Sequence, residues 1–172
     1  MGICTKELIE LVIAPTLREL EPEFTDTQVT GAANLLLATA AAESGLSFHL
    51  HEESKGYGIY DISKLEHLSV WDDFLAFNED LASLVRGFAS QHHFLADPNM
   101  ELATNLNYAT AIAWCLYKKA EINPEELLQN LNAYKMADLW YRYFPGVKDD
   151  QSKGSFVNTY FNCSLNRGKF AA

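Results

Sequence analysis

The chain has 172 residues, of which 48% are apolar, 21% charged and 12% aromatic. These values are typical of one globular domain and exclude a disordered or fibrous chain, so we expect a single domain over residues 1–172. The net charge of −10 disfavours binding to nucleic acid or anionic lipid, because both are recognised by clustered lysine and arginine.

The first expected elements are two helical segments. Residues 1–24 are the N-terminal helical segment, in which residues 5–20 place Leu8, Val12 or Leu11, and Pro15 on one helical face. Pro15 should kink or interrupt this segment. A Thr-x-x-Gln capping box begins at Thr25 and opens a helix over residues 27–44, which Gly45 ends. One face of this Ala-rich helix carries Val29, Ala33, Leu36, Ala40 and Glu43.

The middle of the chain, residues 45–63, is irregular, with a turn at residues 55–58 and a short extended piece at residues 59–62. Helices are expected after it. A capping box at Ser63 and Glu66 opens the first, and Ser69 caps a second that runs through Trp71 and Phe74. Three more are expected over residues 78–88, 97–119 and 123–143. The tail, residues 147–172, should contain a short helix that ends near Tyr160. His92 and His93 should lie in a loop. The fold class is therefore mostly α, with little or no β structure.

The cysteines and the apolar runs bear on the compartment. Cys4, Cys115 and Cys163 are an odd number, lie far apart and form no Cys-x-x-Cys pair, which favours a reducing compartment over a disulfide framework. The N-terminal segment has no run typical of a signal peptide, so we expect production without export. The longest apolar run, residues 35–42, is too short to cross a bilayer, so we expect no membrane insertion.

Glu43 is the sharpest local anomaly, because it continues the apolar face of its helix. Burial disfavours the charged form of a carboxyl group and raises its pKa. A carboxylic acid that is still protonated near neutral pH can donate its proton to a leaving oxygen. The alternative is that Glu43 lies at a fraying helix end and turns to solvent, and periodicity alone leaves both interpretations open.

Four segments follow one another in an order that suggests a family. They are Ala41–Gly45, with Glu43 followed by Ser44; Gly56–Ile62, with its Gly-x-Gly turn; Asn105–Ala111; and Leu139–Gly146. Together they resemble the soluble lytic transglycosylase and goose-type lysozyme family, and more narrowly the small transglycosylase-like proteins of tailed phages. The resemblance covers about residues 27–146 and implies a lysozyme-like helical fold.

The sequence departs from the family pattern in two segments. Asp61 stands where glutamine is usual, so it is either a second carboxylate that works with Glu43 in lysozyme-type hydrolysis or a surface residue of a protein that has lost catalysis. Phe144 and Pro145 replace the usual Tyr-Asn, which leaves either Tyr141 or Tyr143 for the role of orienting the acid.

The resemblance implies cleavage of the β-1,4 bond between N-acetylmuramic acid and N-acetylglucosamine in peptidoglycan, without a metal or an organic cofactor. Glu43 would be the acid and base, with Asp61 as the second catalytic candidate. The implied contacts to the glycan strand are Ser44, Tyr57, Gly58, Ile59, Tyr60, Asn105, Tyr108, Tyr141 and Tyr143.

The resemblance also implies a location in a phage virion or in the cytoplasm of the infected bacterium, with other virion proteins as further partners. The acidic charge favours the virion, because an unanchored acidic enzyme is repelled by an anionic wall. One alternative is a non-catalytic structural or glycan-binding component of the particle with the same fold. Another is a plain helical interaction protein.

The remaining candidates are weaker. Tyr57, Tyr60, Trp71 and Tyr143 could pack on sugar faces, whereas core packing is favoured for Trp114 and Trp140, and Cys115 is expected in the core. His49-x-His51-Glu52-Glu53 groups four ligand types without further ligand spacing, which favours a solvated loop over a metal site. The resemblance places this loop at the edge of the groove, where His51 or Glu52 would touch substrate.

Overall fold

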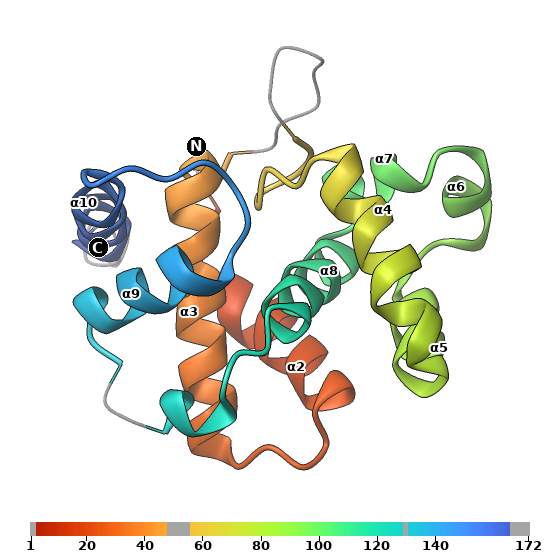
Figure 1. Ribbon diagram of the computed structural model, residues 1–172, viewed down its shortest axis with the longest axis horizontal. Coiled ribbons are helices and arrows are strands. Elements are labelled where there is room, and N and C mark those ends of the chain that lie inside the picture. Colours follow the sequence, from red (N-terminus) through yellow and green to blue (C-terminus); the bar gives the residue numbers. More distant parts are fainter. Residues whose placement is uncertain (1–2, 48–55, 129–130, 166–172) are drawn as a thin grey trace.

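The computed structural model describes residues 3–47, 56–128 and 131–165 (Figure 1). The predicted mostly helical class is confirmed. No strand occurs among these residues, and an isolated antiparallel bridge joins Tyr57 to Ile62. The helices are α1 (Thr5–Glu7), η1 (Leu8–Ile13), α2 (Ala14–Leu20), α3 (Asp26–Ser44), α4 (Lys64–Asp73), η2 (Leu75–Phe77), α5 (Glu79–Phe88), α6 (Gln91–Ala96), α7 (Pro98–Thr104), α8 (Leu106–Lys119), η3 (Pro124–Leu127), α9 (Ala133–Tyr143) and α10 (Ser152–Leu165).

The N-terminal helical segment is not interrupted at Pro15 but changes its hydrogen-bonding pattern just before it. Leu8–Ile13 form the π-helical stretch η1, and α2 follows with Pro15 in its first turn. Proline has no N–H, and its ring crowds the carbonyl four residues earlier. A locally widened turn relieves that crowding without ending the helix.

Helix α3 is the central element, and both of its predicted ends are confirmed. The Thr25 hydroxyl accepts from the Gln28 backbone N–H, while the Gln28 side chain accepts from the Thr25 N–H at 2.9 Å. Gly45 ends the helix in the left-handed conformation, with φ of 63°. Burial extends well beyond the predicted face, because α3 lies between α2, α9 and α10 and also contacts α8 (Figure 1). Its small side chains allow these neighbours to approach.

Helix α8 joins the two sides of the molecule. It packs against α2 and α3 from the first part of the chain, and against α4, α5 and α7 from the middle of the chain (Figure 1). The middle of α8 is buried, including Trp114 and Tyr117. The arrangement leaves the C-terminal end of α3 and the turn at residues 56–62 adjacent, which sets the position of Glu43.

Two sequence expectations about the shorter helices are wrong. Ser69 does not cap a helix, because the capping box at Ser63 and Glu66 already starts α4, which runs through Ser69. His92 and His93 lie in α6, which the Ser90 hydroxyl caps by accepting from the His93 N–H.

The two longest expected helices are each divided. The helix over residues 97–119 breaks at Asn105, whose extended backbone ends α7 and whose side chain caps α8. Between residues 123 and 143 the described helices are η3 and α9, and Asn132 caps α9 by accepting from the Lys135 N–H. In both cases an asparagine competes with the helix backbone for hydrogen bonds.

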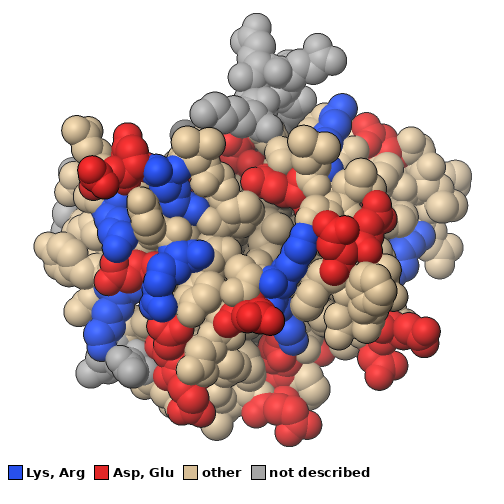
Figure 2. Space-filling model, in the orientation of Figure 1, with Lys and Arg blue, Asp and Glu red and all other residues tan. Residues whose placement is uncertain are grey.

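The surface is mixed in charge on the face drawn in Figure 2, where basic and acidic side chains lie interspersed. Within the described part of the chain, no helix combines the length and the apolar character that a bilayer span requires.

Candidate active site

Glu43 lies in the last turn of α3, and its carboxylate is held by a neighbouring helix. The Trp140 indole on α9 donates a hydrogen bond of 2.6 Å to Oε1 of Glu43. Glu43 is half-buried and Trp140 is 7% exposed. The Glu43 side chain therefore does not swing freely in solvent at a frayed helix end, which was the alternative from sequence.

The surroundings of Glu43 raise the pKa of its carboxyl group towards neutral pH. Burial is the main cause and raises the pKa of the carboxyl from 4.5 to about 7. The hydrogen bond from Trp140 and the charge of Lys148 lower this pKa, whereas the negative charges of Asp61 and Glu66 raise it. A carboxyl with such a pKa is populated in both forms near pH 7, so it can donate a proton and later accept one.

The turn beside Glu43 depends on both glycines of the Gly-x-Gly motif. A Cβ on Gly56 would lie 2.1 Å from the Asp61 carbonyl oxygen. Gly58 has φ of +70°, and a Cβ there would lie 1.9 Å from the Leu102 carbonyl oxygen. The backbone hydrogen bonds between Tyr57 and Ile62 close the turn at 2.9 and 3.2 Å. The motif therefore allows the turn to pack directly on the backbone of α7.

Side chains from two helices anchor this turn. The Ser44 hydroxyl, next to Glu43, donates to the Ile59 carbonyl at 2.6 Å. The Tyr60 hydroxyl is hydrogen-bonded to Thr110 of α8 at 3.2 Å. Ile59 and Tyr60 are both fully buried. Their side chains, and that of Ser44, thus position the turn rather than face solvent, while Tyr57 stays half-buried with Lys64 over its ring.

Asp61 is half-buried in a left-handed backbone conformation, with φ of 48°. Its Oδ1 accepts a hydrogen bond of 3.0 Å from the Gly56 N–H, across the turn. An aspartate tolerates this backbone conformation better than most residues. Asp61 thus stabilises the turn, and its charge acts on Glu43 at the same time.

The two tyrosines considered for orienting the acid make other contacts. Tyr143 donates to Glu126 at 2.9 Å, and the Tyr141 ring lies under Lys153 at 4.8 Å. Among the hydrogen bonds of the described residues, Trp140 is the partner of Glu43 in this segment. This role of Trp140 is not evident from the sequence, although Trp140 lies in one of the segments that carry the resemblance.

Asn105 is used to hold helices together. Its side-chain carbonyl accepts from the Tyr108 N–H at 3.1 Å, and its amide donates to the Phe88 carbonyl at 2.8 Å and to Glu101 at 2.9 Å. Glu101 is 1% exposed and also accepts from the Ser90 hydroxyl and N–H. Burial acts to raise the pKa of Glu101, but these hydrogen bonds hold it below its ordinary value.

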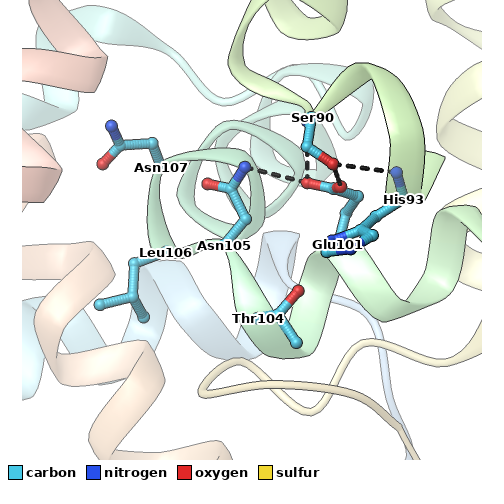
Figure 3. A pocket seen from close by; sticks show the side chains of 7 residues that line it. All are labelled: Ser90, His93, Glu101, Thr104, Asn105, Leu106 and Asn107. Carbon is cyan, nitrogen blue, oxygen red and sulfur yellow. Dashed lines mark hydrogen bonds between the residues drawn. The ribbon is translucent and has the colours of Figure 1, made fainter.

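Ser90, Glu101 and Asn105 line a pocket of about 450 Å³. The other lining residues are His93, Thr104, Leu106 and Asn107 (Figure 3). In this view Asn105, Glu101 and Ser90 point toward one another, whereas Leu106 and Asn107 point away from that cluster. A second pocket, of about 400 Å³, lies between the first half of α3 and Leu127, Leu128 and Leu131. Neither pocket includes Glu43.

Tyr108 belongs to a buried polar network between α4, α7 and α8. The side-chain oxygen Oδ1 of Asn99 can only accept a hydrogen bond, so Nδ1 of His67 donates to it at 3.0 Å. The other ring nitrogen of His67, Nε2, then accepts from the Tyr108 hydroxyl at 2.6 Å. The Trp71 indole donates to the same hydroxyl at 2.9 Å. Tyr108 is fully buried, so it contributes packing and hydrogen bonds rather than an exposed contact.

The remaining candidates are placed as follows. Trp114 and Trp140 are buried, as predicted. Cys115 is also buried, which confirms its place in the core, and burial raises the pKa of its thiol to about 12. His49, His51, Glu52 and Glu53 lie outside the described residues. Within the part that is described, no group of histidine, cysteine and acidic residues could hold a metal ion.

Comparison with known proteins gives no further guide to the site. No family model matches the chain, and no curated protein or solved structure is significantly similar to it.

Proposed function

We propose that this protein is a peptidoglycan-cleaving muramidase that uses Glu43 as its acid and base. The single observation that carries the proposal is the half-buried Glu43 carboxyl, with a pKa of about 7, beside the Gly-x-Gly turn. The resemblance of that turn and its flanking segments to the lytic transglycosylase pattern supplies the substrate class. The bond cleaved would be the β-1,4 link between N-acetylmuramic acid and N-acetylglucosamine.

The proposed reaction uses one carboxyl group twice. Protonated Glu43 gives its proton to the glycosidic oxygen, which leaves with the electron pair of the broken C1–O bond. The resulting carboxylate then takes the proton of the muramyl 6-hydroxyl while that oxygen forms a new bond to C1. The product is a 1,6-anhydro ring, and Glu43 is again protonated.

A single carboxyl is preferred over a Glu43–Asp61 pair because Asp61 accepts the hydrogen bond that closes the turn. A hydrolytic base would need that carboxylate to be free to orient a water molecule. Asp61 would instead keep the turn in place and add negative charge near the oxocarbenium-like transition state.

The second candidate is a non-catalytic glycan-binding or structural component of a phage particle. The use of Asp61 and of the Phe144–Pro145 segment for internal contacts favours it, since the usual family residues are absent there. Both candidate functions imply a location in the virion or in the infected cell, and other virion proteins as partners.

The test is the release of fragments from purified peptidoglycan, analysed by mass spectrometry. The muramidase proposal expects anhydro-ended fragments from the wild type and at least about a hundredfold less release from Glu43→Gln. Reducing ends would indicate hydrolysis and would restore Asp61 as the base. Absence of release by the wild type, with retained binding to peptidoglycan, would favour the non-catalytic candidate. Full release by Glu43→Gln would overturn the catalytic assignment.

A further inference from the structure

Lys148 is held next to the candidate acid by the end of α9. Its ammonium group donates to the Phe144 carbonyl and, at 3.2 Å, to the Pro145 carbonyl. It also lies 4.7 Å from the centre of the Trp140 ring. Lys148 is half-buried, so this position is fixed by contacts rather than sampled in solvent. The two carbonyls come from the segment in which the chain departs from the family pattern.

Trp140 connects this cation to the carboxyl. Its ring packs on Phe156 of α10 with centroids 5.0 Å apart, and its Nε1 donates to Glu43 at 2.6 Å. A cation over an aromatic face withdraws electron density from the ring. An indole N–H polarised in this way is a better donor to an anionic acceptor, because neighbouring interactions strengthen one another where the dielectric is low.

Among the described residues that act most strongly on Glu43 by their charge, Lys148 is the cation. The others are Asp61 on the turn and Glu66 on α4, both negative, and the neutral indole donor of α9. Without a cation, two carboxylates and burial would all oppose the ionised form of Glu43. The effect is mutual, since burial lowers the pKa of Lys148 while Glu43 and Glu66 raise it.

We propose that Lys148 is a positioning residue for Glu43, acting through Trp140 to fix the carboxyl and to favour its ionised form once its proton has left. The inference rests on the proposed function for its catalytic meaning, because only a one-carboxyl cycle needs Glu43 as a base in the second step. The structural part, coupling between Lys148 and Glu43, holds whether or not the protein cleaves a glycan.

The test is the titration of the Glu43 carboxyl by carbon-13 NMR, with Glu43→Gln used to assign its signal. In Lys148→Met the titration midpoint should rise by about 0.5 to 1 pH unit, and Lys148→Arg should restore it. The matched control is Lys153→Met, since Lys153 lies over the Tyr141 ring and pairs with Asp138. It should leave the midpoint unchanged. An unchanged midpoint in Lys148→Met would overturn the proposal.

Two further measurements remain if Lys148→Met fails to fold. In Glu43→Gln the pKa of Lys148 itself should fall by a similar amount, because coupling between two sites is reciprocal. In a Trp140→Phe background the Lys148→Arg and Lys148→Gln midpoints should differ by less than they do with Trp140 present. An equal difference would show that Lys148 does not act on Glu43 through the Trp140 indole and would overturn the proposal.

The activity readout separates this inference from the proposed function. If the wild type cleaves peptidoglycan, Lys148→Met should move the high-pH limit of cleavage upward and slow the step that needs the carboxylate. Cleavage with no such change would overturn the inference alone. A shifted Glu43 midpoint without any cleavage would overturn the proposed function alone.

Discussion

The indole of Trp140 donates a 2.6 Å hydrogen bond to the carboxyl of Glu43, joining residues 97 positions apart in the chain. This contact ties the end of the central helix α3 to α9. It also explains why a carboxylate can sit at the end of an apolar helix without turning to solvent. Burial and the indole act on the acid in opposite directions, and burial has the larger effect.

Replacing Trp140 by phenylalanine should raise the pKa of Glu43, because the hydrogen bond that favours the ionised form is lost while an aromatic ring remains against Phe156. The high-pH limit of fragment release should therefore move upward, and the rate should fall about tenfold from loss of orientation. The pH profile of release measures both effects.

Trp114→Phe is the control for that substitution. Trp114 makes an equivalent indole-to-carboxylate bond of 2.8 Å, to Glu21 rather than to Glu43. Its pH profile should match that of the wild type. Coincident profiles for both tryptophan variants would contradict a role for Trp140 at the acid.

Glu43→Gln should stabilise the protein at high pH and leave its stability unchanged at low pH. The folded-state pKa is about 7 against 4.5 for an unperturbed carboxyl, so the folded state binds more protons between these values. Wild-type stability therefore falls as pH rises through this window. The variant avoids this loss, and its advantage should be about 1–3 kcal/mol at pH 8 and near zero at pH 4.

Thermal or denaturant unfolding at several pH values measures this difference. The comparison is informative because glutamine can still accept the Trp140 hydrogen bond. A constant difference between the two proteins from pH 4 to pH 8 would mean that Glu43 titrates as an ordinary surface carboxyl.

Gly58→Ala should destabilise the protein by about 2–4 kcal/mol, because the new Cβ meets the Leu102 carbonyl oxygen in a backbone conformation with positive φ. Gly87→Ala is the matched control, since nothing lies within 4 Å of a Cβ there and Gly87 is in α5. It should be neutral or stabilising by up to about 1 kcal/mol. Denaturant unfolding distinguishes the two, and equal effects would show that the turn does not need its second glycine.

Local sequence signals correctly predicted where several helices begin and end. The capping boxes at Thr25 and Ser63 and the stop at Gly45 each act within a few residues, so spacing alone reveals them. The break at Asn105 was missed by periodicity because the apolar pattern continues across it. Its side chain bonds to Phe88 and Glu101, and these partners are fixed by tertiary structure.

The candidate site was only partly predictable for the same reason. Glu43 was visible as a carboxylate in an apolar pattern, and the glycines of the turn were visible as a motif. The partners Trp140 and Lys148 come from the far end of the chain, and no local pattern links them to Glu43. Tyr60 and Tyr108 illustrate the converse, since aromatic residues near a motif proved to be fully buried.

Asn105→Ala should lower stability by about 2–3 kcal/mol, because it removes the cap of α8 and two hydrogen bonds, to the half-buried Phe88 carbonyl and to the buried Glu101. If Asn105 acts only within the fold, the KM for peptidoglycan fragments should stay within about twofold of the wild type. Thermal unfolding and steady-state kinetics test the two parts separately. A large rise in KM with unchanged stability would instead return Asn105 to the substrate contacts.

The most direct test of Glu43 as the proton donor is the titration of its own carboxyl in the wild-type protein. Carbon-13 NMR should show a midpoint near pH 7, shifted from 4.5 by burial in the cluster formed with Trp140. Such a midpoint leaves a substantial protonated fraction at neutral pH. A midpoint near 4.5 would show an ordinary ionised carboxylate and would contradict the assignment of Glu43 as the acid.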